Sequence, residues 1–338
     1  MTLTALRPTT TRIRRLTGCK PTGHLHLGTL LGMIRPMLAA QHDTDSIMMI
    51  ADLHALTVEH DPARLRAYVA EQARVLLAAG IDPDRTILYV QSDLPEHTGL
   101  HYLLECATGY GEAQRMTQFK EKGAGAAGVR LSLLTYPVLM AADILLHDTD
   151  AVPVGDDQTQ HLELARTIAT RFNARYGEVF TVPVGQRPGV AARVMDLTDP
   201  TAKMGKTNDS ALGTIGLLDP PDLVRRKVMR AVTDTLAVVR HDREAQPGVT
   251  NLLEIYEACT GETTEFPSYG ALKAGVVDAV VARLEPIQRA YAALSPHDVD
   301  LVLADGAERA HPRAAATLRR AGEAIGLRGT VRTERSSS

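Results

Sequence analysis

The stretch "RIRRLTGCKPTGHLHLGTLLGMIRP", residues 12–36, predicts a β-strand that turns directly into a helix. Residues 12–18 form a strand-like segment that ends in a glycine, and residues 21–23 are the Pro, Thr and Gly of a turn. Apolar side chains then recur at helical spacing, at Leu27, Leu30, Leu31, Ile34 and Leu38. A strand followed at once by a helix is typical of a sheet with parallel strands.

The same alternation continues along the chain. Further strands are predicted at residues 46–52, 85–93, 150–155 and 192–200, and helices at 62–79 and 156–172. Beyond Asp219 the strand signal fades, and amphipathic helices follow with breaks at Pro247, Pro267, Pro286 and Pro296. We therefore expect an α/β fold, in which a Rossmann-like doubly wound parallel sheet with an inserted helical segment precedes an all-helical C-terminal domain.

The domain boundaries follow from these changes of pattern. With 338 residues the chain exceeds the usual size of one domain, so two folded domains are expected. The expected parts are a flexible leader at 1–12, a Rossmann-like domain at 13–205 with inserted helices at about 92–150, a helical domain at 206–328 and a flexible tail at 329–338.

Composition excludes several classes of protein. The 44% hydrophobic and 23% charged content is that of an ordinary soluble globular protein. Three widely spaced cysteines, Cys19, Cys106 and Cys259, argue against a disulfide framework or a thiolate zinc site and favour the cytoplasm. The longest apolar run, 133–146, is interrupted by Asp143 before it could span a membrane, so no membrane contact is expected. A net charge of −3 gives no general attraction to nucleic acid, so any contact with a polyanion must be local.

The two histidines of the opening stretch stand where parallel sheets bind ligands. In such sheets ligands lie at the carboxyl ends of the strands, where helix N-termini attract anions. Because Gly28 has no side chain, a planar group could lie against its backbone while His24 or His26 donates to a phosphate. The alternative is that both histidines are half-exposed helix-cap residues. No third ligand supports a metal site, and no GxGxxG loop follows the first strand.

A second polar segment, "KMGKT" at Lys203–Thr207, lies where the sheet domain is expected to end. Two lysines in a loop suit a polyphosphate whose negative charge grows during a reaction. Taken alone, this pentapeptide would be a solvated surface loop. An H-x-G corner after the first strand and a K-M-x-K-T loop after the last strand together resemble the two signatures of class I aminoacyl-tRNA synthetases, in the same order.

Longer blocks resemble the bacterial tryptophanyl-tRNA synthetases. They are "IADLHALT" (50–57), "MTQFKEK" (116–122), "TYPVLMAADILL" (135–146), "VPVGDDQTQHLELAR" (152–166) and "PGVTNLLEIY" (247–256), and the resemblance extends from about residue 13 to 328. It implies that L-tryptophan is activated with ATP and Mg²⁺ to tryptophanyl-adenylate plus pyrophosphate, and is then transferred to the 3′ end of tRNA(Trp). It also implies a homodimer, a catalytic role for 13–205 and an anticodon-binding role for 206–328.

The resemblance further implies roles around the nucleotide. Asp157 would accept a hydrogen bond from a ribose hydroxyl, although Asp156 and Asp157 also suit a helix cap. The implied catalytic residues are Lys203, Lys206, Lys122 and His26. The implied ATP-binding residues are Lys20, Thr22, Gly28, Thr29, Gly155, Asp157, Val194, Met195, Lys203 and Lys206.

The amino-acid pocket is expected on the helix that carries residues 135–146. Pro137 suits a first helical turn, and Tyr136, Met140 and Asp143 then fall on one face. An indole N–H is only a donor, so an ionised carboxylate suits it, and the resemblance implies that Asp143 accepts it. The implied pocket residues are Leu16, His54, Tyr136, Met140, Asp143, Ile144, Val152, Val154 and Gln158. From the residues alone, Asp143 could equally pair with a buried Arg or Lys, and Met140 could be plain core.

The chain departs from the family pattern at several positions. Gly205 and Thr207 replace serines, Thr29 replaces Asn or His, Leu16 replaces an aromatic residue, and Lys20 replaces a neutral amide. Two alternatives stay open: a tyrosyl-tRNA synthetase, and a catalytically weak paralogue that binds tRNA or tryptophan as a regulator or accessory module. In the helical domain the densest basic run, 225–230, is either a solvated helix face or a phosphate contact.

Overall fold

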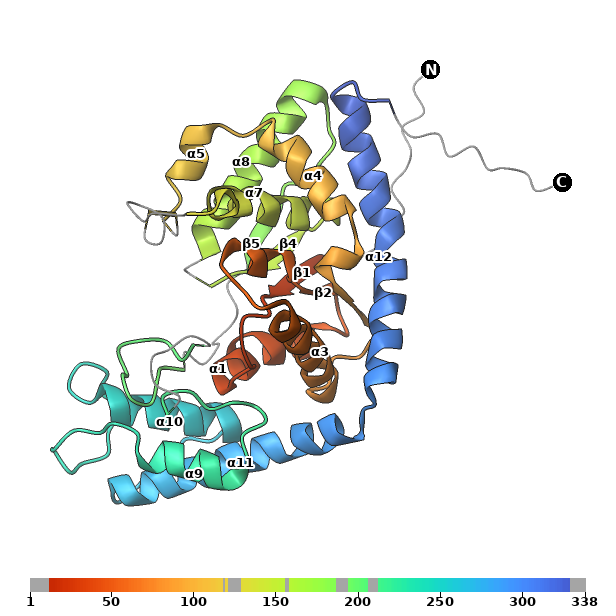
Figure 1. Ribbon diagram of the computed structural model, residues 1–338. Helices are drawn as coiled ribbons and strands as arrows, with labels where there is room; N and C mark the ends of the chain where they lie inside the picture. Colours follow the sequence, from red (N-terminus) through yellow and green to blue (C-terminus); the bar gives the residue numbers. More distant parts are fainter. Residues whose placement is uncertain are drawn as a thin grey trace.

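A parallel sheet of five strands forms the centre of the molecule (Figure 1). The computed structural model describes residues 12–117, 119–120, 129–155, 158–186, 194–205 and 212–328. The spatial order of the strands is β3-β2-β1-β4-β5, so the chain reverses its direction of travel across the sheet after β3. The strands are β1 (Arg14–Cys19), β2 (Asp45–Ile50), β3 (Thr86–Val90), β4 (Ala151–Pro153) and β5 (Val184–Gln186). The expected α/β class with a parallel sheet is confirmed.

Helices cover both faces of the sheet because its strands are apolar on both sides. Met48 and Ile50 of β2 belong to one buried cluster, whereas Ile47 and Met49 belong to the other, as alternation along a strand requires. The first cluster includes side chains from α1 (Leu27–Thr29), the π-helical turn η1 (Leu30–Ile34), α2 (Arg35–Ala40) and α3 (Pro62–Ala78). The second includes side chains from α4 (Glu96–Glu105), α5 (Tyr110–Gln114), α7 (Leu131–Leu146) and α8 (Thr159–Tyr176).

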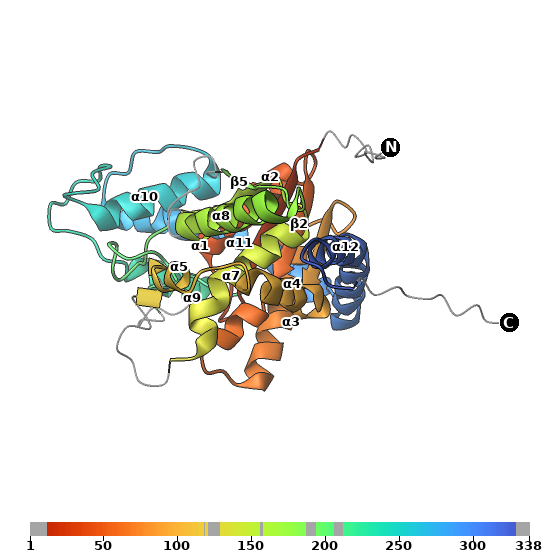
Figure 2. The ribbon, with the colours of Figure 1, turned by 90° about the horizontal axis from the view of Figure 1, so that it is seen from above.

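The C-terminal helices divide into two groups. The helices α9 (Pro221–Met229), α10 (Pro247–Thr260) and α11 (Tyr269–Ala293) pack on one another at one end of the molecule. The long helix α12 (Pro296–Ala324) instead runs back beside the sheet and packs on β3, α4 and α3 (Figures 1 and 2). It thereby covers the β3 edge of the sheet, which would otherwise present unpaired backbone groups. The division at residue 205 stays a prediction, and by its packing α12 belongs with the sheet.

Three local predictions are wrong. The fifth strand is not at 192–200 but at Val184–Gln186, and the described residues 194–200 form only an isolated bridge between Met195 and Lys203. The short strand was hidden because Pro183 precedes it and Pro188 follows it, a composition typical of a loop. Pro137 lies inside α7, not in its first turn, and Pro286 lies inside α11 where a break was expected.

None of the helices in the described parts of the chain combines the length and the apolar content needed to cross a membrane.

Gly306 allows α12 to lie directly against β3, which generates a prediction about stability. A Cβ atom at this position would lie 1.9 Å from the carbonyl oxygen of Leu88, a backbone atom that cannot rotate away. We expect Gly306→Ala to lower the free energy of unfolding in urea by roughly 1–3 kcal/mol, as overpacking does. The control is Gly270→Ala, because the nearest atom to a Cβ there is Ser268 Oγ at 3.8 Å. Equal losses in the two variants would contradict this account of the contact.

Candidate active site

The polar segments of interest follow the carboxyl ends of β1, β2 and β3. The histidine corner follows β1, the 3₁₀ segment η2 (Leu53–Thr57) follows β2, and the 3₁₀ segment η3 (Gln91–Asp93) follows β3. Since parallel strands end at the same edge of a sheet, these three segments lie on one side of it. The inserted helix α7 contacts η2 there.

The histidine corner is held by residues 215–217, which follow the lysine loop (Lys203–Thr207) in the sequence. The backbone N–H of Leu27 donates to the carbonyl of Ile215 at 2.8 Å, and that of Leu217 donates to the carbonyl of Leu25 at 2.9 Å. These bonds form an antiparallel bridge between His26 and Gly216. His26 is the N-cap residue of α1 and is only 8% exposed. The corner is therefore a fixed part of the fold and not a solvated cap, and His24, which is exposed, contacts Glu71.

The two signature segments meet at Gly28. A Cβ atom on Gly28 would lie 3.1 Å from Nδ1 of His26 and 3.7 Å from Cβ of Met204. The ring of His26 thus lies over the glycine, and the described part of the lysine loop packs against it through the buried Met204. Thr29 lies within α1, and Thr22 lies in the turn before it, where its N–H donates to the carbonyl of Lys20 at 3.0 Å.

Lys203 is held by backbone pairing. It forms an antiparallel bridge with Met195, and the N–H of Met204 donates to the carbonyl of Val194 at 3.1 Å. Asn251 of α10 fixes this pair from behind, because its side chain accepts from Met195 N at 2.9 Å and donates to Met195 O at 3.0 Å. The predicted residues Lys206, Lys122 and Asp157, together with Asp156, lie outside the described residues.

Lys20 lies between the two predicted pockets. Its Nζ donates to the hydroxyl of Thr57 at 3.1 Å, and this hydroxyl donates to the carbonyl of His54 at 2.9 Å. The cation at the end of β1 is therefore joined to the segment that carries His54. On the other side of β1, Gly155 follows β4 and its carbonyl accepts from Gln158 N at 3.0 Å.

The predicted amino-acid pocket combines an apolar wall with polar side chains. The predicted apolar residues Leu16, Ile144 and Val152 belong to one buried cluster, and Met140 and Val154 pack against it. Tyr136 lies edge-on to His54, with ring centroids 6.2 Å apart, and its hydroxyl is 2.8 Å from Nε2 of His161. Gln158 is half-buried at the start of α8. Apart from Gln158, the structure brings these predicted residues together from β1, η2, α7 and the β4 region.

Asp143 is buried and receives three hydrogen bonds. Its side chain is 3% exposed, Oδ2 lies 2.7 Å from His54 Nε2, and Oδ1 lies 2.7 Å from both His97 Nδ1 and Gln91 Nε2. Burial by itself would raise the pKa of Asp143, but the hydrogen bonds from His54 and His97 outweigh it and hold the pKa well below its usual value. The carboxylate is therefore ionised, and two imidazoles and an amide hold it in place of the Arg or Lys of the alternative interpretation.

A polar cluster behind Asp143 was not predicted from the sequence. The hydroxyl of Tyr89 lies 2.8 Å from Nε2 of His97 and 2.7 Å from Nε2 of His147, and all three side chains are at most 1% exposed. Burial raises the pKa of Tyr89, helped by the charge of Asp143, and burial lowers the pKa of His147. Gln91 could have been found, because it lies near the carboxyl end of the strand predicted at 85–93, but no pattern in the sequence pointed to the other three.

Comparison with known proteins identifies the family. Residues 8–295 match the family described as tRNA synthetases class I (W and Y). This chain belongs to that family. Over 326 residues the synthetase is 53% identical to tryptophan–tRNA ligase 1 of Streptomyces avermitilis, an alignment that covers 93% of this chain and 98% of that protein.

Solved structures agree with this assignment. The tryptophanyl-tRNA synthetase of Mycoplasma pneumoniae superposes with a TM-score of 0.88 at 37% identity, covering 94% of this chain and 98% of that one. That of Campylobacter jejuni, complexed with ADP and tryptophan, superposes with a TM-score of 0.80 at 32% identity, covering 93% and 100%. The resemblance to bacterial tryptophanyl-tRNA synthetases that the sequence blocks indicated is confirmed.

The buried His147 generates a prediction about pH. Because its folded-state pKa lies below the unfolded value of about 6.5, the unfolded chain binds the proton first as the pH falls, and stability is lost. We expect protonation of His147 in the unfolded chain to lower the free energy of unfolding by up to about 1.4 kcal/mol for each pH unit below about 6.5. Urea unfolding between pH 7 and pH 5 should therefore show a shallower slope for His147→Gln, which cannot ionise.

The matched control is the exposed His42, since His42→Gln should leave the slope unchanged. An unaltered slope in His147→Gln would show that this imidazole is not kept neutral by the fold.

Proposed function

We infer that this chain is a tryptophan–tRNA ligase, which activates L-tryptophan with ATP to tryptophanyl-adenylate and pyrophosphate and transfers it to the 3′ end of tRNA(Trp). The observation that carries the inference is the ionised Asp143, an acceptor for a ring N–H beside an apolar wall. Nearly full-length likeness to bacterial tryptophan–tRNA ligases supports it. The C. jejuni relative complexed with ADP and tryptophan supports both small ligands.

The chemistry needs positioning and positive charge more than proton transfer. The carboxylate of tryptophan is already an anion, so it attacks the α-phosphorus of ATP without a general base, and pyrophosphate leaves. We propose that Lys203, Lys206 and Lys122 bind the phosphates and stabilise the charge that develops there. Lys20 supplies a further cation at the end of β1. The exposed side chain of Lys203, on a segment anchored by Met204, suits this role.

The remaining contacts of the nucleotide are proposed around the histidine corner. His26 and Thr29 would contact the nucleotide, adenine would pack at Gly28, and Asp157 would accept from a ribose hydroxyl. The bare backbone of Gly28, between the His26 ring and Met204, supports this arrangement. Thr22, Gly155, Val194 and Met195 would complete the site.

In the amino-acid pocket, we propose that Asp143 accepts the indole N–H and that Met140 packs on the ring. Tyr136 and Gln158 would hold the ammonium group, and His54 would close one wall. The apolar remainder of the pocket would be formed by Leu16, Ile144, Val152 and Val154, four side chains that lie in or against one cluster.

Mg²⁺ would enter with the triphosphate of ATP. Among the described residues there is no group of three or more His, Cys, Asp or Glu side chains placed to hold a metal ion. The phosphate oxygens of the nucleotide are therefore the proposed ligands, in keeping with the preference of Mg²⁺ for phosphates and water. The cytoplasm is the proposed location, which the wide spacing of Cys19, Cys106 and Cys259 in the sequence favours.

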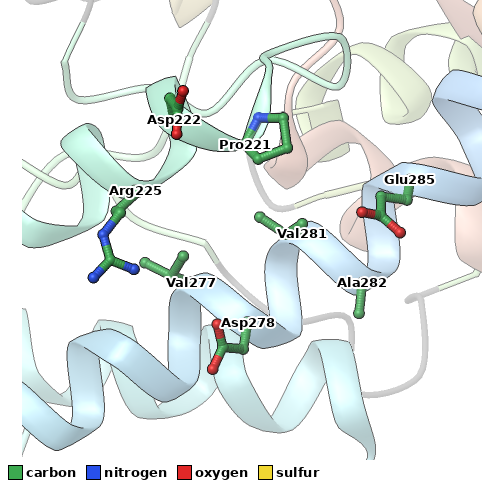
Figure 3. Close-up of a pocket in the computed structure, with 8 residues that line it drawn as sticks. All are labelled: Pro221, Asp222, Arg225, Val277, Asp278, Val281, Ala282 and Glu285. Atoms are coloured by element: carbon green, nitrogen blue, oxygen red, sulfur yellow. The ribbon is translucent and has the colours of Figure 1, made fainter.

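We propose that α9, α10 and α11 take part in binding the anticodon region of the tRNA. The basic run at 225–230 is not a uniform surface, because Lys227 is buried and its Nζ lies 2.6 Å from Asp219. The groove between α9 and α11 carries Arg225 together with three carboxylates, Asp222, Asp278 and Glu285 (Figure 3). This lining is net negative and unsuited to phosphate, so contacts with the tRNA backbone are expected outside the groove.

The homodimer is proposed on the inserted helices. The helices α4 and α5 both contact α7, and the three lie together in both views (Figures 1 and 2). Each presents a large exposed side chain: Tyr102 is 66% exposed, Tyr110 is 68% exposed and Leu131 is 74% exposed. Exposed aromatic side chains of this kind favour a protein interface.

The function is tested by amino-acid-dependent exchange of pyrophosphate into ATP, measured across all twenty amino acids. We expect strong exchange with tryptophan alone, because only its ring N–H satisfies Asp143 within an apolar pocket. Removal of Mg²⁺ with EDTA should abolish the exchange, and added Mg²⁺ should restore it. Equal exchange with tyrosine would overturn the substrate assignment, and no exchange with any amino acid would favour the non-catalytic paralogue.

The dimer is tested by sedimentation equilibrium. Wild type should be a dimer, and Tyr102→Glu with Tyr110→Glu should weaken it by roughly 30-fold or more, the effect of losing about 2 kcal/mol at an interface centre. Leu301→Glu on α12 is the matched control, because Leu301 is 56% exposed and lies near the start of α12, whereas His311 and Leu318, which approach α4, lie farther along it. A monomeric wild type, or equal weakening by Leu301→Glu, would reject this interface.

A further inference from the structure

The buried cluster behind Asp143 forms a continuous chain of hydrogen bonds. It runs from His147, at the end of α7, through Tyr89 of β3 and His97 of α4 to Asp143 of α7, with each polar contact between 2.7 and 2.8 Å. We propose that this chain has one fixed direction of donation and positions Asp143 as the acceptor for the substrate ring. His97, Tyr89 and His147 would then be positioning residues for tryptophan specificity, an inference that rests on the proposed function.

The direction follows from counting protons. Ionised Asp143 can only accept, so the proton of His97 must be on Nδ1. In neutral His97 the Nε2 atom is then an acceptor, and the hydroxyl of Tyr89 must donate to it. The oxygen of Tyr89 in turn accepts from Nε2–H of His147. Every donor has an acceptor in this arrangement.

The opposite direction fails at its end. If Tyr89 donated to His147, the proton of His147 would be on Nδ1, an atom buried without a hydrogen-bond partner among the described residues. His97 would then have to carry two protons to supply both Asp143 and Tyr89. A buried N–H without a partner costs much more than a buried lone pair of a neutral imidazole, so the first direction is the stable one.

The surroundings of the hydrogen-bond chain support a neutral His147. Burial lowers the pKa of His147, helped by His97 and by Arg313 of α12, while Asp143 acts in the opposite sense. Arg313 itself is paired with Asp45 at 3.0 Å. Burial also keeps the hydroxyl of Tyr89 protonated, because it raises its pKa. Tyr89 and His147 thus bring no positive charge to Asp143.

The hydrogen-bond chain also determines which carboxylate oxygen of Asp143 faces the substrate. Oδ1 of Asp143 accepts from both Gln91 and His97, so its two lone pairs are used. Among the residues that the structure describes, Oδ2 accepts only from His54, at 2.7 Å, which leaves one lone pair for the substrate. A ring N–H from the substrate can therefore bind only at Oδ2, beside His54, and the charge on that oxygen makes the bond strong. A substrate without a ring donor leaves this lone pair buried and unpaired.

The first test is the protonation state of the imidazoles, read by ¹⁵N NMR of histidine-labelled full-length protein without substrate. We expect a neutral His97 with the proton on Nδ1 and a neutral His147 with the proton on Nε2, assigned by single substitution of each histidine. An imidazolium at His97, or a proton on Nε2 of neutral His97, would overturn the fixed direction whatever the activity of the enzyme.

The second test compares two substrates in pyrophosphate exchange: tryptophan, and 3-benzothienyl-L-alanine, in which sulfur replaces the ring N–H. Tyr89→Phe should raise KM for tryptophan roughly tenfold and leave kcat and the KM of the analogue nearly unchanged, because one charge-assisted bond is misaligned. The matched control is Tyr291→Phe, since Tyr291 is half-buried and stacks with Arg74 far from Asp143. If Tyr89 had only a structural role, Tyr89→Phe would raise the KM values of both substrates together and would also lower the thermal stability of the protein.

A pair of variants at His97 keeps the test decisive if Tyr89→Phe folds poorly. His97→Asn retains an N–H near Nδ1 and should preserve the preference for tryptophan over the analogue. His97→Gln places its amide near Nε2 and should lose it. Equal selectivity in the two variants would overturn the positioning role, whereas a wild type without tryptophan-dependent exchange would overturn the proposed function and the specificity role together.

Discussion

An ionised carboxylate cannot remain inside a protein core unless donors surround it, and Asp143 imposes that constraint on this fold. The donors come from three segments: His54 from η2, Gln91 from η3 and His97 from α4. Because η2 and η3 follow β2 and β3, the carboxylate ties the inserted helices to the edge of the sheet where ligands bind. The acceptor that we propose selects the substrate is thus also the group around which these segments are assembled.

The segments that we propose bind the nucleotide are held in a different way, by hydrogen bonds between backbone segments far apart in the sequence. The corner after β1 is bridged to residues near Gly216, and Lys203 is bridged to Met195, so both signature segments are anchored by main-chain hydrogen bonds. Side chains at these positions can change without loss of the anchors. The replacement of serine by Gly205 therefore need not displace Lys203, because backbone pairing with Met195 holds this lysine.

The parts that could be predicted from the sequence are those that rest on local pattern. Strands β1 to β4 and helix α3 were predicted because strand-like and helical segments alternate along the sequence, whereas β5 is three residues between prolines and was missed. The face shared by Tyr136, Met140 and Asp143 followed from helical spacing alone. The partners of Asp143 did not, because His97 reaches it only through the packing of α4 against α7, which no local period encodes. Tyr89 is joined to Asp143 through His97.

The two halves of the site share one short segment. The hydroxyl of Thr57 accepts from Lys20 and donates to the carbonyl of His54, and His54 donates to Asp143 from its ring. Lys20, a cation suited to phosphate, and His54, a wall of the proposed amino-acid pocket, are therefore held by the same 3₁₀ turn, Leu53–Thr57. If Lys20 moved toward a phosphate, its hydrogen bond to Thr57 would change. We therefore propose that Lys20 influences the binding of both substrates, because a neutral amide at this position would present neither the positive charge nor the same donor geometry to Thr57.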